Sequence, residues 1–272
     1  MEKEVELFNG NFEYTLTDLP GVKFLDAQEE IDMQVDTKEN EGTDGGILGS
    51  ATFGPFNLFL NISYKGNDAE DVRLIKQKLR SLLFRRDPYY IWHSDTPQKR
   101  YAVYCEALDS EDLTNSFSTF EITFVVYKGF SESLKSTKDI DFLLEDIHLS
   151  EDRSVEDYGY AFNRSRFVIY NAGDVTVDPR EHYLNIKIEG SSDGELTINN
   201  KTTKERFIYK PTLRSRTGDW LDLNGVYPKK NGVNCGIDTN HGLISLVPGI
   251  NEIEIKNANE IKTSWDFYFL YK

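Results

Sequence analysis

The feature that most constrains this fold is a period-two alternation of apolar and polar residues. It is clearest over residues 57–64, 101–106 and 120–127, where an apolar residue takes every second position. Successive side chains of a β-strand point to opposite faces, so this spacing predicts strands with one buried face. The 13% aromatic content also favours packed strands. We therefore expect a mostly β protein with antiparallel sheets.

One segment, residues 69–84, has the spacing of an α-helix. Its apolar residues recur at helical intervals: Val72, Ile75, Leu79, Leu82 and Leu83. Asn67 or Asp68 can cap its N-terminus, and Pro88 follows its C-terminus. The pattern predicts a single helix beside the N-terminal strands.

The chain is long enough for two domains, and its composition changes near the middle. Residues 136–157 are rich in Ser, Lys, Asp and Glu and predict a connector, with a short helical turn within residues 139–148. Residues 1–135 are expected to form an antiparallel β-sandwich with one helix. In residues 158–272, short strands alternate with turn signals and predict a second β-sandwich. Its strands are expected at residues 166–171, 183–189, 195–199, 205–210, 243–247, 251–256 and 264–271.

Residues 40–54 are rich in Gly and lack periodicity, which predicts a long flexible loop or a hairpin. Such a segment is either a mobile surface excursion or an arm that becomes ordered against a neighbouring subunit. Both interpretations stay open.

The formal net charge of −15 argues against specific nucleic-acid binding, because an acidic chain repels DNA unless a basic stripe reverses the field. The one basic cluster is Arg80, Arg85 and Arg86, at the end of the predicted helix, where cations complement the helix dipole. No apolar run approaches the ~20 residues that span a bilayer, and the N-terminus lacks a signal sequence. We expect a protein that is made in the cytoplasm and does not enter a membrane.

No motif predicts catalysis, a metal site or a cofactor. The four histidines, His93, His148, His182 and His241, are scattered without zinc-ligand spacing. Nucleophile and phosphate-binding motifs are missing, and residues 238–242 depart from a calcium loop. The expectation is a protein that is not an enzyme and has no catalytic, cofactor-binding or metal-binding residues.

Trp220 and Tyr227 are the candidate contacts with a ligand. Their flat rings could stack on a sugar or meet a protein partner, and they could equally fill the core or anchor a loop.

Several segments resemble the distal tail protein family of long-tailed bacteriophages (siphophages). Residues 71–83, 88–92, 99–104 and 120–124 are similar to the helix and strands of its N-terminal domain. In the C-terminal half, residues 167–173, 196–200, 245–251 and 265–269 resemble the galectin-like sandwich that many of its members carry.

This resemblance implies a structural role at the distal end of the virion tail. A hexameric ring built from the N-terminal domains would join the tail tube protein to a tail-associated or baseplate hub protein. The galectin-like domains could also hold a receptor-binding protein. The alternative is a carbohydrate-binding adhesin that reads host cell-surface glycans through its C-terminal sandwich.

Overall fold

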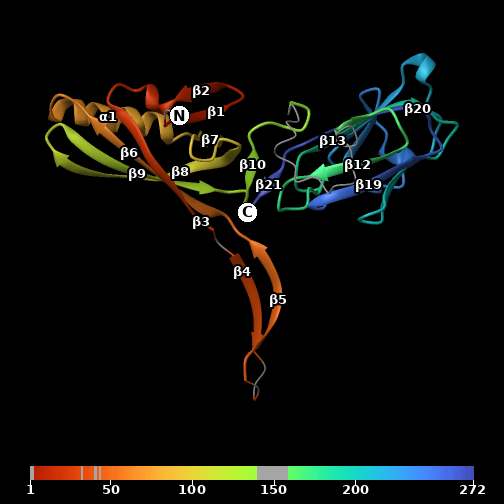
Figure 1. Cartoon of the computed structure of the whole chain (residues 1–272), viewed down its shortest axis with the longest axis horizontal. Coiled ribbons are helices and arrows are strands. Elements are labelled where there is room, and N and C mark those ends of the chain that lie inside the picture. The colour runs from red at the N-terminus through yellow and green to blue at the C-terminus, as the bar shows by residue number, and fades with distance from the viewer. Residues whose placement is uncertain (1–2, 32, 40–41, 43, 140–158) are drawn as a thin grey trace, which may run out of the picture. The chain divides into compact units, whose positions relative to one another are not determined.

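The computed structural model describes residues 3–31, 33–39, 42, 44–139 and 159–272. The chain divides into two units, Met1–Leu134 with Lys272, and Lys135–Tyr271. His148 and most of the predicted connector, including nearly all of its helical turn, lie outside the described residues. The expected fold class, mostly β with one helix, is confirmed. Figure 1 shows the elements in chain order.

Unit 1 is built on one antiparallel sheet in the order β2-β1-β7-β8-β9-β6-β3. Alternate residues of its central strands, such as Leu58, Leu60 and Ile62, are fully buried, as the period-two pattern predicts. The strands are β1 (Val5–Asn9), β2 (Phe12–Thr15), β3 (Val22–Glu30), β6 (Phe56–Lys65), β7 (Tyr89–His93), β8 (Lys99–Thr114) and β9 (Phe117–Val126). A short strand, β10 (Ser131–Ser133), pairs with β8.

Helix α1 (Ala69–Leu83) packs its apolar stripe against this sheet, and the helix prediction is confirmed. The Asp68 carboxylate accepts hydrogen bonds from the backbone N–H groups of Glu70 and Asp71, at 2.9 and 3.0 Å. At the other end, the Tyr89 hydroxyl donates to the carbonyl of Leu83 at 2.7 Å. The sequence-predicted helix and sheet therefore share one core.

Leu79 lies at the centre of that stripe and is fully buried. We expect Leu79→Ala to lower the free energy of unfolding of unit 1 by ~2–5 kcal/mol, because it removes packed atoms and leaves a cavity. Denaturant unfolding measures the change, with exposed Leu74→Ala on the same helix as the control. Equal effects of the two substitutions would contradict the assignment of the stripe to the core.

His93 is buried in unit 1 and stacks on Tyr101, with ring centroids 5.5 Å apart. Burial lowers the pKa of His93 below its ordinary value, although the nearby Asp95 and Glu29 oppose the shift. The unfolded chain then binds a proton more readily than the folded one, so stability falls as the pH drops below the unfolded pKa of about 6.5.

We therefore expect unit 1 to be less stable at pH 5 than at pH 7, and His93→Gln to reduce that difference. Denaturant midpoints at the two pH values measure it. A His93→Gln variant with the full pH dependence of the parent would show that other groups cause it.

Unit 2 is a sandwich of two antiparallel sheets. The six-stranded sheet has the order β11 (Ala161–Phe162), β20 (Asn259–Phe267), β13 (Leu184–Ser191), β16 (Trp220–Asn224), β17 (Tyr227–Lys230) and β18 (Val233–Asn234). The four-stranded sheet has the order β12 (Arg166–Asn171), β19 (Gly249–Lys256), β14 (Leu196–Asn200) and β15 (Glu205–Tyr209). Apolar residues of both sheets fill the interior, among them Ile188, Trp265, Ile169 and Ile198.

The structure differs from the sequence-based expectation in unit 2: β11 and β18 were not expected, β20 begins at Asn259 instead of residue 264, and two further segments differ more strongly. Residues 243–247, expected as a strand, form only an isolated bridge between Leu246 and Val177. The segment around Trp220 and Tyr227, where no strand was expected, forms the hairpin β16–β17. Its two-residue turn starts at Gly225, whose positive φ of 58° suits glycine.

Candidate functional site

A two-stranded hairpin, β4 (Met33–Glu39) and β5 (Gly46–Phe53), extends from the ends of β3 and β6 as an arm (Figure 1). The two strands form a sheet of their own. The segment predicted as a flexible loop or hairpin, residues 40–54, therefore contains a full strand. Its partner β4 was not expected.

The arm has one apolar face. Met33 lies opposite Phe53 and Val35 opposite Ala51, and directly paired residues of antiparallel strands share a face. Met33 is 53% exposed, and Val35 and Phe53 are each 37% exposed. An isolated hairpin is only marginally stable in water, and this one leaves much of its apolar face exposed, although Lys272 lies over the Phe53 ring at 4.6 Å. Such a face is typical of a surface that another molecule covers.

The candidate residues Trp220 and Tyr227 both lie on the outer face of the six-stranded sheet. Trp220 is opposite Glu189 on β13, and Tyr227 is opposite Asn224 across the hairpin turn. Their strand positions are four residues apart, roughly 13 Å at the rise of a β-strand. Lys187 lies over the Trp220 ring at 5.5 Å, whereas Tyr227 is 66% exposed. One sugar ring could not contact both.

The same face carries two buried acceptor oxygens that sequence reasoning missed. Asn185 and Asp266 are directly paired between β13 and β20. Oδ1 of each is buried and has no hydrogen-bond partner among the described residues. The Tyr183 hydroxyl donates to Asp266 Oδ2 at 2.8 Å, and burial followed by this bond raises the pKa of Tyr183. Because both Oδ1 atoms are buried, this structure does not present them to a ligand.

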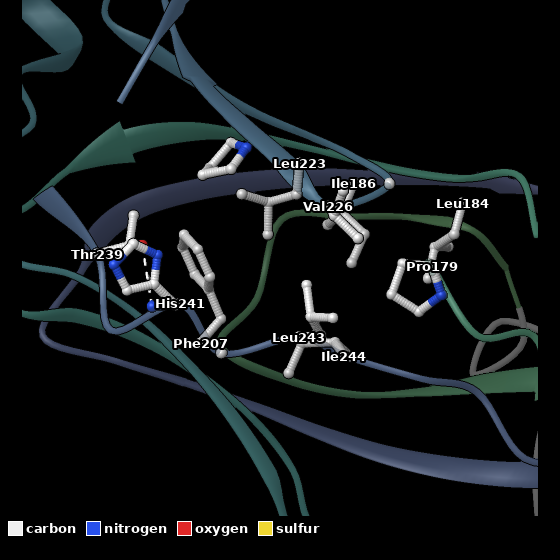
Figure 2. Close-up of a pocket in the computed structure, with 13 residues that line it drawn as sticks. Pro179, Leu184, Ile186, Phe207, Leu223, Val226, Thr239, His241, Leu243 and Ile244 are labelled. Carbon is white, nitrogen blue, oxygen red and sulfur yellow. Dashed lines mark hydrogen bonds between the residues drawn. The ribbon is translucent and has the colours of Figure 1, made fainter. Parts of the chain in front are cut away.

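An apolar pocket of about 250 Å³ opens between the two sheets of unit 2 (Figure 2). Leu184, Leu223 and Phe207 form parts of its wall, and Val226 lines it while its neighbour Tyr227 lies on the outer face. Thr239 and His241 supply its polar side chains, and the Thr239 hydroxyl accepts the His241 backbone N–H at 3.1 Å. The lining contains no carboxylate, thiol or amine, so it offers no general acid or nucleophile other than the imidazole and hydroxyl.

The three histidines that the structure describes are not brought together. His93 is in the core of unit 1, His182 accepts the Asp178 backbone N–H at 3.0 Å, and His241 lines the pocket. In the described ranges, no group of three or more His, Cys, Asp or Glu side chains is placed to hold a metal ion. Among the described helices, none is long and apolar enough to cross a membrane.

The acidity of the chain is concentrated in its N-terminal half. Residues 1–134 contain 24 acidic and 13 basic side chains, a balance of −11, whereas residues 159–272 contain 14 acidic and 15 basic ones.

The basic cluster was expected to complement the negative end of the helix dipole. This is confirmed for Arg85, whose Nε donates to the Leu82 carbonyl at the C-terminus of α1 at 2.9 Å.

Residues 11–126 match the model of a family described as the phage tail protein RIFT-related domain. The matched region lies within unit 1 and makes up most of it, so unit 1 is similar to this phage tail domain. The matched region runs from just before β2 to the end of β9, so it contains the arm and helix α1. We call residues 11–126 the tail domain. No curated protein matches the chain in sequence.

Over nearly its whole length the chain has the fold of the SPP1 Dit protein (gp 19.1). The SPP1 Dit protein is described as a paradigm of the hub adsorption apparatus in phages that infect Gram-positive bacteria. The TM-score is 0.71 at 13% identity, covering 97% of this chain and 99% of that chain. The activated baseplate of phage p2 with Sr gives a TM-score of 0.43 at 9% identity, covering 98% of each chain. The sequence-based resemblance is thus confirmed by the tail domain and by the fold of the whole chain.

Proposed function

We propose that this protein is a structural hub at the distal end of a siphophage tail. Residues 1–135 close a hexameric ring with copies of themselves, and residues 158–272 form a galectin-like domain at its periphery. The ring joins the tail tube protein to a baseplate hub protein, and the peripheral domains hold a receptor-binding protein. The chain is made in the host cytoplasm and acts as a scaffold, not as an enzyme.

The apolar face of the arm carries this proposal. A ring requires a heterologous contact, in which one surface of a subunit meets a different surface of the next. An arm that extends beyond the main sheet of unit 1, with Met33 and Val35 exposed and Phe53 covered only by Lys272, can reach such a neighbour. The family of the tail domain and the fold shared with SPP1 Dit support the same role.

The charge distribution supports a lumen for DNA. The −11 balance of residues 1–134 belongs to the domain proposed to form the ring. An acidic channel repels the phosphate backbone and lets DNA pass without sticking. The same charge makes identical subunits repel one another, so the contacts between them must include buried apolar area.

Light scattering on the purified full-length protein, together with negative-stain images, tests the proposal. We expect hexamers or multiples of them at high protein concentration, with a central channel. Because assembly depends on concentration and partners, the measurement is repeated with the tail tube protein added. A protein that stays monomeric in both conditions would contradict the ring.

The adhesin remains the second candidate function, and the outer face of the six-stranded sheet favours it. Two exposed aromatic side chains lie on this face: Tyr227, and Tyr183, whose hydroxyl donates to Asp266. Sugar hydroxyls can donate hydrogen bonds to a carboxylate such as that of Asp266, and aromatic rings stack on sugar rings. Glycan-array binding by the full-length protein, lost in Asp266→Ala, would support it. The absence of any glycan signal would contradict it and leave the hub proposal intact.

A further inference from the structure

The outer face of the four-stranded sheet is basic in a chain whose net charge is −15. Arg166 on β12 is paired with Glu254 on β19, Glu254 with Asn199 on β14, and Asn199 with Arg206 on β15. The two arginines therefore lie in one row across four strands, roughly 14 Å apart at the usual strand spacing. Lys201 and Lys256 adjoin the row. We call these four cations, with Glu252 and Glu254 between them, the basic face.

Glu254 holds three of these cations in place. Its side chain is only 9% exposed, and its carboxylate oxygens lie 2.7 Å from Arg166 Nη2, 3.3 Å from Lys256 Nζ and 3.5 Å from Lys201 Nζ. Burial alone would raise the pKa of Glu254, but Lys256, Lys201 and Arg166 together lower it below its ordinary value. One carboxylate thus orders three cations and neutralises only one of them.

The ordered cations remain available to another molecule. The side chains of Arg166 and Lys256 are 76% and 58% exposed. Arg206 is exposed and its guanidinium has no hydrogen bond or ion pair with any described residue. Beside the row, Arg164, Arg166 and Lys201 line a shallow hollow of about 330 Å³. The Arg166 guanidinium, held by Glu254, loses little further entropy when it meets a carboxylate, and the fork geometry of both arginines allows bidentate pairing.

We propose that the basic face docks the acidic surface of another protein of the tail. The inference rests on the proposed hub function only for the source of that partner, and it does not depend on the number of subunits in the ring.

Two observations favour a protein over a uniformly charged polymer such as a polyphosphate. Glu252 and Glu254 stand among the cations and would repel a continuous row of negative charges, whereas a protein surface can place a cation or a neutral group opposite them. Next to the row, Tyr170 is paired with Ile250, which is 37% exposed, and Val168 is half-buried. Interfaces between proteins combine apolar side chains with arginine in this way.

The test uses full-length protein and two fluorescent probes, a short peptide of alternating glutamate and threonine, and inorganic polyphosphate of similar total charge. Fluorescence anisotropy at increasing salt gives the affinities. We expect salt-dependent binding of the peptide that is at least as tight as binding of polyphosphate. Arg206→Gln should weaken peptide binding about tenfold, because one charge-assisted hydrogen-bonded pair is lost. Since the Arg206 guanidinium has no hydrogen bond or ion pair with a described residue, this substitution should leave the denaturant midpoint unchanged.

Lys262→Gln is the matched control, because Lys262 is an exposed cation on the outer face of the other sheet. We expect it to keep the peptide affinity within about twofold. Any of three results would overturn the proposal: no salt-dependent peptide binding, tighter binding of polyphosphate than of the peptide, or equal losses in Arg206→Gln and Lys262→Gln. Light scattering on the same Arg206→Gln sample should show unchanged assembly, so failure of the ring and failure of this docking surface are separate outcomes.

Discussion

Replacing the arm by a tight turn is expected to abolish ring assembly and to leave both units folded. The last paired residues of β3 and β6 are Glu30 and Asn57, so an Asn-Gly turn in place of residues 32–55 can join the two strands and keep Phe56, which is buried in the core. Because the arm pairs only with itself, its loss removes no strand from the main sheet of unit 1. The apolar area that it offers a neighbour is lost with it. Light scattering should show monomers where the parent shows rings.

Two point variants separate the apolar face from the mere presence of the arm. Val35→Asp places a charge on the apolar face, whereas Gln34→Asp places the same charge on the opposite face of the same strand. We expect the first to weaken assembly strongly and the second to change it little. Full assembly of the truncated protein, or equal effects of the two aspartates, would rule the arm out as the contact between subunits.

Removing the carboxylate of Glu132 is expected to cost unit 1 about 3–5 kcal/mol of its free energy of unfolding, the loss typical of a broken buried ion pair. The Glu132 side chain is only 7% exposed and meets two cations. Arg100 donates to Oε2 from Nη2 at 2.8 Å and from Nε at 3.1 Å, and Lys128 donates to Oε1. Burial alone would lower the pKa of Lys128, and Glu132 raises it above its ordinary value.

In Glu132→Ala both cations would stay partly buried beside the Tyr90 ring without a counter-charge. Denaturant unfolding measures the loss, and Glu121→Ala, at an exposed site on β9, is the control. Glu132→Gln keeps the side-chain volume and should recover part of the loss. A midpoint for Glu132→Ala equal to that of Glu121→Ala would show that water, not Glu132, stabilises the two cations.

The gap between the expected and observed arm has a physical cause. Residues 40–54 contain five glycines, and glycine carries no side chain whose alternation could mark a strand. The usable signal was the pair of short alternations, Met33 with Val35 and Ala51 with Phe53, on either side of the glycines. In the part of the chain that the structure describes, this hairpin packs against no core, so its apolar residues are too few to form a longer pattern.

The candidate site was predictable only as residue types. Trp220 and Tyr227 were identified because large aromatics near polar residues are common in binding sites. Their common face, the distance between them and the acceptors of Asn185 and Asp266 depend on pairing between strands that lie far apart in the sequence. Polar side chains at such positions look like ordinary solvent-facing residues in a sequence.

The sequence by itself determined the local elements. Helix α1 and the central strands β6 and β9 follow from side-chain periodicity, because burial of one face imposes a repeat that can be read along the chain. Only the tertiary structure decided which strands pair, and pairing assembled the apolar face of the arm and the basic face around Glu254. These surfaces bring together residues whose contacts are set by strand order and register, and a single sequence carries neither.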